Sequence, residues 1–351
     1  MKLIARCAVS VAVVIAIASP LQARKKSHHA SPAKPQPNQT EAATRLQVFL
    51  ERANFSPGAI TGRYNDFTFK ALSLYRESRG ESQPSPAAKP NAPPNTNGID
   101  FGSVGPAFTD YTVTDTDLQS VGPVPAGVPA QAKLKFLPYR DAAEAVAEKF
   151  HCDVRFLGEL NPGKTKTIKP GDHLKVPNVE PFDLGGVKEL KPGSEINAPA
   201  ANELPNESPP TDDQTPPTIT VKVDTKTNML GVFDADKLIA AYPVTIGSAK
   251  TASPIGEWKV QRIVKLPTFR WDEAMLNYGH RSGNFHMLPP GPNSPIGVIW
   301  IALNKTGIGM HGTNEPETIG HAASHGCIRL ANWDVVRLAQ KIKPGVPVSI
   351  H

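Results

Sequence analysis

The sequence lacks an apolar run of the ~20 residues that a membrane-spanning helix needs. Its most apolar stretch, Cys7 to Ser19, is too short to span and follows the basic residues Lys2 and Arg6. Leu21-Gln22-Ala23 then offers a small residue before a cut, so the first 23 residues are typical of a secretory signal peptide. We therefore expect export to the periplasm or cell envelope, with no membrane span after signal cleavage. An uncleaved anchor is the alternative.

Cysteine is also scarce. Of the three cysteines, Cys7 lies in the signal segment, and the mature chain keeps Cys152 and Cys327. Two cysteines in an exported protein are compatible with a disulfide. We expect instead a free Cys327, for the reasons given below, and a packed Cys152 that behaves as a small buried hydrophobe.

Long blocks of basic residues are missing too. The net charge of +6 suits an anionic polymer, but the densest basic run is only Arg24-Lys25-Lys26, which disfavours nucleic acid as a partner. Proline is abundant, with 36 residues gathered in clusters that mark linkers. A chain of 351 residues with such linkers is expected to hold two or three domains.

One C-terminal string, HGTNEPETIGHAASHGCIRLANWD, places His311, Cys327 and Arg329 close together in sequence. The thiolate is the strong nucleophile, and His311 is a base that can produce it. Gly326 permits close approach to a reacting carbonyl, so nearby backbone N–H groups can hold an oxyanion. Arg329 can bind a carboxylate through two hydrogen bonds. These residues predict a cysteine acyltransferase or hydrolase that acts beside an anionic group.

The same string resembles the signature of the L,D-transpeptidase catalytic domain of bacterial cell walls, which pairs HGT with SHGC(I/V)R. The resemblance extends from about Thr218 to the C-terminus and includes the upstream motifs Tyr242-Pro243-Val244, Ser253-Pro254-Ile255-Gly256 and Pro295-Ile296-Gly297. Ser253-Pro254 stands where the family often has Thr-Pro. The resemblance implies a mainly β catalytic domain, in agreement with the apolar alternation of the segment.

The resemblance also implies the chemistry. Cys327 attacks a tetrapeptide stem of peptidoglycan at the diaminopimelate–D-alanine bond, and an amine from a second stem or a lipoprotein lysine resolves the thioester. His311 is the general base and acid, oriented by the Gly312 carbonyl. The implied supporting roles are carboxylate binding by Arg329, oxyanion binding by the Gly326 N–H, and an auxiliary role for His325. No cofactor and no metal are expected.

Two upstream segments resemble wall-binding modules. LQVFLERANFSPGAITGRYNDFTFKALSLYRESRG is similar to the small helical peptidoglycan-binding domain, and YTVT with LNPG and IKPGDHLKVP is similar to a LysM carbohydrate-binding module. The second departs from the compact LysM pattern by an insertion, Asp117 to Phe136. We expect glycan strands and stem peptides as partners.

The predicted fold class is multidomain: a helical N-terminal module, an α+β middle module and a mainly β catalytic domain. Within the catalytic domain, Thr268 to Pro295 is expected to form a lid or substrate wall, and Asn332 to cap a late helix. The predicted parts are a signal peptide (1–23), a linker (24–39), a helical module (40–82), a linker (83–108), a LysM-like module (109–180), a linker (181–217) and the catalytic domain (218–351).

Three alternatives remain at this stage. A zinc site could use His311, His321, His325 and Cys327, but their spacing matches no metal signature. The enzyme could be a hydrolase that passes the thioester to water. The chain could also be a non-catalytic envelope-binding protein, although a binder has no need of a nucleophile.

Overall fold

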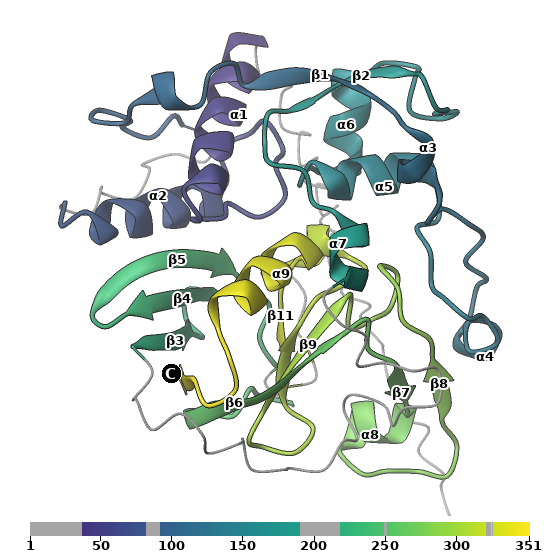
Figure 1. Cartoon of the computed structure of the whole chain (residues 1–351). Helices are drawn as coiled ribbons and strands as arrows, with labels where there is room; N and C mark the ends of the chain where they lie inside the picture. The colour runs from purple at the N-terminus through teal and green to yellow at the C-terminus, as the bar shows by residue number, and fades with distance from the viewer. Residues whose placement is uncertain (1–36, 82–91, 190–217, 249–250, 321–323, 325) are drawn as a thin grey trace, which may run out of the picture. The chain divides into compact units, whose positions relative to one another are not determined.

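The computed structural model of the chain describes residues 37–81, 92–189, 218–248, 251–320, 324 and 326–351, which Figure 1 shows in colour. The predicted signal segment 1–23 and most of the predicted linker 24–39 lie outside these ranges. Within them, no helix is both long and apolar enough to cross a membrane.

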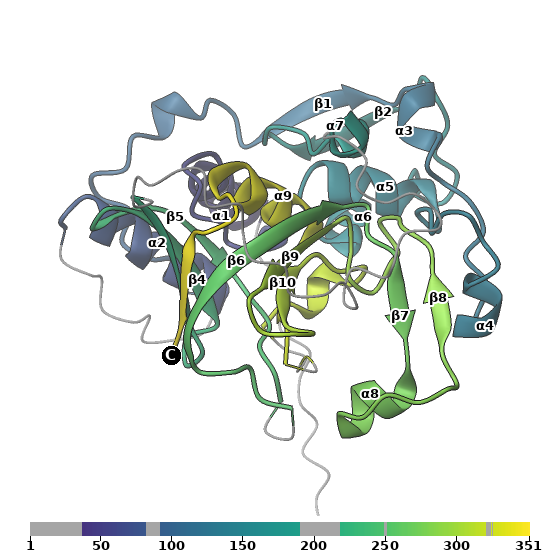
Figure 2. The same ribbon diagram turned by 60° about the horizontal axis from the view of Figure 1, so that its bottom comes forward.

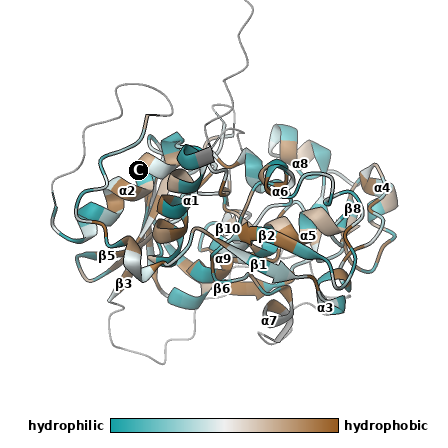
Figure 3. Cartoon of the chain, turned by 90° about the horizontal axis from the view of Figure 1, so that it is seen from above, coloured by the Kyte–Doolittle hydropathy of each residue, from teal (hydrophilic) through white to brown (hydrophobic). Residues whose placement is uncertain are grey.

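The first described segment is a pair of helices, α1 (Pro37–Arg52) and α2 (Asp66–Ser78). Asn65 caps α2, because its side chain accepts a hydrogen bond from the Thr68 backbone N–H. Leu46 and Leu72 are fully buried. Figure 3 shows hydrophilic and hydrophobic residues on both helices, as expected for helices with one face against a core. Both helices agree with the helical module that the sequence analysis predicts over residues 40–82.

The middle segment is built around two antiparallel strands, β1 (Phe108–Thr112) and β2 (His173–Pro177). Asp141 and Asp153 cap two helices that lie between these strands in sequence. The helices of this segment are η1 (Phe101–Ser103), α3 (Asp115–Leu118), α4 (Val128–Gln131), α5 (Ala142–Lys149), α6 (Val154–Leu160) and α7 (Leu184–Glu189).

The C-terminal segment is a curled eight-stranded sheet in the order β11-β10-β9-β6-β12-β3-β4-β5. Two pairs are parallel, β10 with β11 and β12 with β3, and the other pairs are antiparallel. Its strands are β3 (Ile219–Asp224), β4 (Met229–Asp234), β5 (Lys237–Pro243), β6 (Gly256–Lys265), β9 (Ile299–Leu303), β10 (Gly309–His311), β11 (Ile328–Arg329) and β12 (Pro347–Ile350).

A small hairpin and three helices complete this segment. The hairpin pairs β7 (Phe269–Trp271) with β8 (His286–Leu288), and α8 (Glu273–Tyr278) lies between the two strands in sequence (Figure 2). The remaining helices are η2 (Pro316–Thr318) and α9 (Asn332–Lys341).

The prediction that Asn332 caps the late helix is wrong, because Ala331 is the N-cap and Asn332 is the first helical residue. The Asn332 carboxamide is buried and makes long-range contacts instead. Its Nδ2 donates to Glu148 Oε1 of α5 at 3.1 Å, and its Oδ1 accepts from the Val298 N–H at 3.1 Å. Because the Asn332 carboxamide makes these contacts, it does not cap the first turn of its own helix.

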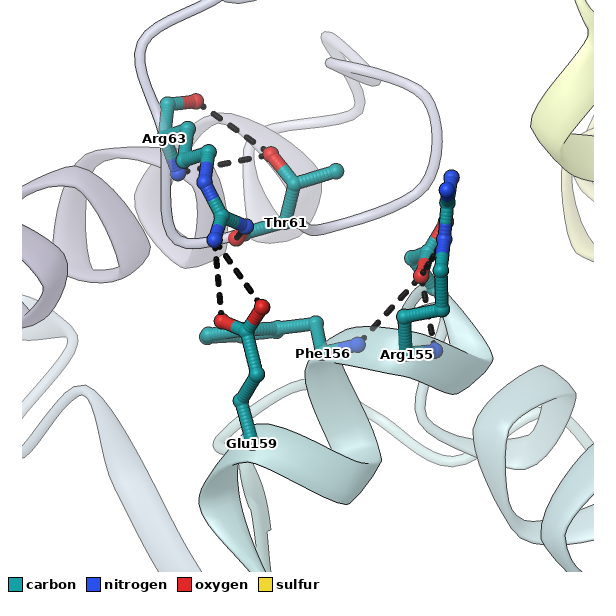
Figure 4. A network of polar contacts seen from close by, with 6 residues as sticks. Thr61, Arg63, Arg155, Phe156 and Glu159 are labelled. Atoms are coloured by element: carbon teal, nitrogen blue, oxygen red, sulfur yellow. Dashed lines mark hydrogen bonds and ion pairs between the residues drawn. The ribbon is translucent and has the colours of Figure 1, made fainter. Parts of the chain in front are cut away.

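The helical segment packs directly on the edge strand of the sheet. Ala241 of β5 donates its N–H to the Asn54 carbonyl, and the Ser56 N–H donates to the Ala241 carbonyl, both at 2.9 Å. Phe55 and Ala241 share one apolar cluster with residues of the middle segment. Arg63 contributes an ion pair with Glu159 of α6 at 2.9 Å (Figure 4).

The segments are therefore less isolated than the predicted linkers suggest. Val104 and Ala107, in the predicted linker 83–108, are buried. Phe182 and Leu184, in the predicted linker 181–217, pack into the same apolar cluster as the sheet. Both ranges are rich in proline and polar residues. This composition predicted linkers, although a few apolar side chains in each range are buried against the neighbouring segments. Residues 82–91 and 190–217 lie outside the described ranges.

Candidate active site

Strand pairing brings three of the predicted site residues together. His311 ends β10 and lies opposite Arg329 in the parallel β11, while Cys327 directly precedes β11. The Leu330 N–H donates to the His311 carbonyl at 2.8 Å and fixes this register. Cys327, His311 and Arg329 all line one cavity of about 510 Å³.

His311 is held in one tautomer. Its ring is buried, and its Nδ1 lies 2.7 Å from the carbonyl oxygen of Gly312. Because a carbonyl oxygen only accepts hydrogen bonds, Nδ1 carries the hydrogen and Nε2 is left as a proton acceptor. This contact is the one that the family resemblance implies for Gly312.

The surroundings of His311 fix its position further. Trp300 stacks on the imidazole, with ring centroids 5.5 Å apart and an interplanar angle of 17°. A Cβ on Gly312 would lie only 2.2 Å from Asn332 Oδ1, so this position has no room for a side chain. The sequence analysis missed Trp300, because an apolar residue in a buried strand gives no sign that it stacks on His311.

Burial favours the neutral forms of His311 and Cys327. It lowers the pKa of His311 to about 3, helped by the Arg329 charge and opposed by the hydrogen bond to Gly312. Burial raises the pKa of Cys327 to about 11, against the lowering effects of a backbone hydrogen bond from Gly309 and the Arg329 charge. The Cys327 thiol donates to the Gly307 carbonyl at 3.5 Å. The site without substrate therefore holds a thiol and a neutral imidazole at pH 7.

A neutral thiol has a measurable signature. We expect the rate of Cys327 alkylation by iodoacetamide to rise about tenfold per pH unit from pH 7 to pH 9 without a plateau, because only the thiolate reacts. Mass spectrometry of the Cys327 peptide gives the rate, and a Cys152→Ala background removes the other described thiol. A plateau below pH 8 would instead indicate a preformed thiolate–imidazolium pair.

Ser324 fixes the loop before Cys327. Its N–H donates to the Ile246 carbonyl at 2.8 Å, and its own carbonyl accepts from Thr251 Oγ1 at 3.0 Å. Its hydroxyl donates to the Cys327 carbonyl. The sequence analysis assigned no role to Ser324, although it is the first residue of SHGC and its small hydroxyl suits a loop.

Gly326 has a φ of +105°, a conformation that favours glycine. Its N–H donates to Ser324 Oγ at 3.3 Å, so binding an oxyanion there requires exchange of this long hydrogen bond. The predicted auxiliary residue His325, and His321 of the zinc alternative, lie outside the described residues.

Arg329 is well placed for an anion. Burial lowers its pKa, Glu315 and Cys327 raise it, and a guanidinium remains charged in either case. Its Nε is buried and has no hydrogen-bond partner within the described part of the chain. A buried cationic donor without a partner is costly, and a ligand carboxylate in the cavity would satisfy it.

Two further segments complete the cavity. Phe269, Trp271 and Leu276 come from the β7–β8 hairpin region, where the sequence predicts a lid or wall. Val128 and Gln131 of α4 come from the middle segment. The sequence analysis singled out the insertion that carries α4 but did not place it at the site, because no local pattern reveals a contact between such distant segments.

Comparison with known proteins gives a consistent match for this region. Residues 218–350 match the model of the YkuD family, described as the L,D-transpeptidase catalytic domain. The chain is 32% identical over 158 residues to a putative L,D-transpeptidase YkuD of Bacillus licheniformis, covering 45% of this chain and 78% of that protein. It is 33% identical over 135 residues to a putative L,D-transpeptidase YqjB of Bacillus subtilis, covering 37% and 69%.

Two further similarities are more distant. A probable L,D-transpeptidase YbiS of Escherichia coli is 31% identical over 116 residues, which is 32% of this chain and 37% of that protein. The solved catalytic domain of an Enterococcus faecium L,D-transpeptidase is 20% identical, over 40% of this chain and all of that one. Its TM-score of 0.31 is too low to add to the sequence matches.

Proposed function

Because the chain belongs to the L,D-transpeptidase family, we propose that it is an exported enzyme that transfers peptidoglycan stem peptides through a thioester on Cys327. The observation that carries this proposal is the His311 Nδ1–Gly312 carbonyl contact of 2.7 Å, beside a cavity that Cys327 and Arg329 also line. The contact leaves His311 Nε2 as a base within the same cavity as the thiol.

The first half-reaction forms the acyl-enzyme. His311 Nε2 takes the thiol proton as Cys327 Sγ attacks the carbonyl of the diaminopimelate–D-alanine bond. The C–N bond of the tetrahedral intermediate then breaks, and His311 returns the proton to the leaving D-alanine amine. In the second half-reaction an amine attacks the thioester, His311 takes its proton, and the C–S bond breaks to restore the thiol.

The neutral ground state constrains the order of these events. With the pKa of Cys327 raised to about 11 and the pKa of His311 lowered to about 3, proton transfer alone from the thiol to the imidazole is unfavourable. The transfer therefore has to coincide with S–C bond formation, as general-base catalysis requires. Arg329 aids this step by holding a substrate carboxylate beside the thiol.

Product analysis tests the proposed reaction. The full chain is incubated with defined tetrapeptide muropeptides and an amine acceptor, and the products are identified by mass spectrometry. We expect cross-linked stems together with free D-alanine. Tripeptide stems without cross-links would show a hydrolase instead, and unchanged substrate with intact protein would favour a non-catalytic binder.

Arg329 is expected to recognise the stem carboxylate. Arg329→Lys keeps the charge but loses the planar pair of donors, so we expect catalytic efficiency to fall tens-fold, equivalent to about 2 kcal/mol. Amidation of the stem carboxylate should slow the wild-type enzyme strongly and the variant only slightly. The measurement compares kcat/KM of both enzymes on free-acid and amidated stems. An equal decrease in kcat/KM on amidation in both enzymes would indicate that Arg329 has a structural role and does not bind the stem carboxylate.

We also propose that the upstream segments 40–82 and 109–180 are wall-binding modules of the peptidoglycan-binding and LysM-like types, and that residues 1–23 direct export. The support is the sequence resemblance, together with the helix pair α1–α2 and the order β1, α5, α6, β2 in the middle segment. A lipoprotein lysine is a further acceptor compatible with this location.

A further inference from the structure

Part of the catalytic cavity comes from outside the segment that matches the family. Gly127, Val128 and Gln131 line the cavity with Cys327, whereas the family match begins at residue 218. These three residues belong to the insertion between β1 and α5. Residues 122–137, which are most of the insertion Asp117 to Phe136 together with Leu137, are called the inserted wall below.

The inserted wall has a closed base. The Gly122 N–H donates to the Tyr139 carbonyl at 2.9 Å, and the Tyr139 N–H donates to the Ser120 carbonyl at 2.8 Å. The two ends of the wall are therefore adjacent, and the residues between them form a loop that projects from the middle segment. Figures 1 and 2 both show α4, which lies in this loop, beside β8.

The inserted wall also makes hydrogen bonds to the C-terminal segment. The Leu137 N–H donates to the Pro290 carbonyl at 2.8 Å, and Asn293 Nδ2 donates to the Pro138 carbonyl at 2.7 Å. A Cβ at Gly291 would lie 2.1 Å from the Leu137 carbonyl oxygen, so only glycine permits this approach. The wall is thus held by backbone contacts at the end of the hairpin region.

Apolar packing joins the inserted wall to the surroundings of the nucleophile. Leu137 is fully buried in a cluster with Phe269 and Trp300. Val128 and Cys327 both pack against this same cluster. Trp300 in turn stacks on His311. The position of the wall is therefore set by the same side chains that position the thiol and the base.

Gln131 offers the cavity a particular kind of hydrogen bond. Its Nε2 donates to the Pro125 carbonyl at 3.1 Å, within the inserted wall. That contact fixes the orientation of the carboxamide, because a carbonyl oxygen can only accept. The carboxamide keeps Oε1, an acceptor that suits an N–H donor, together with the second hydrogen of Nε2.

We propose that the inserted wall is a specificity-determining part of the catalytic cavity, in which Gln131 Oε1 accepts a hydrogen bond from an N–H group of the peptide substrate. Val128, on the same short helix, packs against the aliphatic part of that peptide. This inference rests on the proposed transpeptidase function for the identity of the substrate, and it adds a contact from a segment that lies outside the matched catalytic domain.

A pair of glutamine variants tests the contact. Gln131→Met keeps the length of the side chain but lacks the acceptor, and Gln119→Met changes an exposed glutamine that does not line the cavity. Loss of one hydrogen bond of about 1.4 kcal/mol predicts a tenfold lower kcat/KM for Gln131→Met, expressed as a raised KM. Gln119→Met should match the wild type. Iodoacetamide alkylation of Cys327 should be equal in all three proteins. Equal KM values within twofold would overturn the proposal.

Excision of the loop tests the wall as a whole. Residues 124–135 are replaced by a short Gly/Ser loop, which the closed base permits, while Leu137 and its contacts are kept. We expect a KM at least tenfold higher than that of the wild type, with Cys327 alkylation as fast or faster. An unchanged KM in a protein with an unchanged melting temperature would contradict the role of the wall.

A binding measurement separates this inference from the proposed reaction. Calorimetry with an unreacted tetrapeptide stem compares Cys327→Ala protein with and without Gln131→Met. A tenfold weaker Kd in the double variant supports the contact even if the wild type transfers no acyl group, and an equal Kd overturns it. Failure of the wild type to transfer, with this Kd difference present, would refute only the proposed reaction.

Discussion

The Cys327→Ala protein is expected to lose turnover of tetrapeptide stems by a factor on the order of 10³ or more, because removal of a nucleophile abolishes the covalent route. The side chain is small and partly exposed to the cavity, so its truncation should leave the fold intact. Steady-state rates on defined muropeptides give the loss, and melting temperature gives the state of the fold. A carbapenem should also form a covalent adduct on Cys327.

Cys152 supplies a matched control. It is a free thiol like Cys327, but it is buried in an apolar cluster, and burial raises its pKa further. Cys152→Ala should keep turnover and the carbapenem adduct, at a cost in stability only. Turnover or an adduct that persists in the Cys327→Ala protein would assign the nucleophile to another residue.

Glu51 is expected to have the largest effect on stability. Its carboxylate is fully buried and contacts the Arg337 guanidinium and His151 Nδ1, the latter at 2.8 Å. Glu51 lies in α1, His151 in the middle segment and Arg337 in α9, so one carboxylate joins all three segments. Burial acts to raise the pKa of Glu51, but Arg337 and His151 outweigh it, and the pKa is lowered.

Glu51→Gln removes the charge and leaves Arg337 without its counter-ion in a largely buried position. Breaking a buried pair in this way costs about 3–5 kcal/mol, a large share of the 5–15 kcal/mol typical of domains. Urea unfolding at pH 7 measures the change. Glu41→Gln, at an exposed position on the same helix, should change the free energy of unfolding by less than about 0.5 kcal/mol.

The contribution of Glu51 should depend on pH in a defined direction. Since its pKa is lowered in the folded state, its stabilising effect is complete above the unfolded pKa and is lost as the pH falls through the folded pKa. The difference between wild type and Glu51→Gln should therefore shrink in acid. A difference below 1 kcal/mol at pH 7 would show that the three segments do not depend on this carboxylate.

The sequence could predict which candidate site residues lie together because a short motif carries them. His311, Cys327 and Arg329 lie within one string, and two adjacent parallel strands then place them at one cavity. The helical character of the N-terminal module was likewise predicted, and α1 and α2 agree with it. Local patterns could not show that Asn332 turns away from its own helix to reach Glu148.

Contacts between distant segments account for the other differences. The inserted wall contacts the C-terminal segment through a backbone hydrogen bond between Leu137 and Pro290, which are far apart in sequence. Glu51 meets Arg337 across a still longer separation. Such contacts depend on how whole segments pack, and neither composition nor periodicity records them. For this reason the proline content predicted linkers where the structure has apolar side chains that pack with the neighbouring segments.

The acyl-enzyme itself gives the most direct test of the central claim. The full chain is mixed with a tetrapeptide stem in the absence of an acceptor, quenched in acid and weighed intact by mass spectrometry. A thioester on Cys327 predicts a mass gain equal to that of the stem minus D-alanine, located on the Cys327 peptide and missing from Cys327→Ala. No mass gain while D-alanine is released, or the same gain in Cys327→Ala, would contradict it.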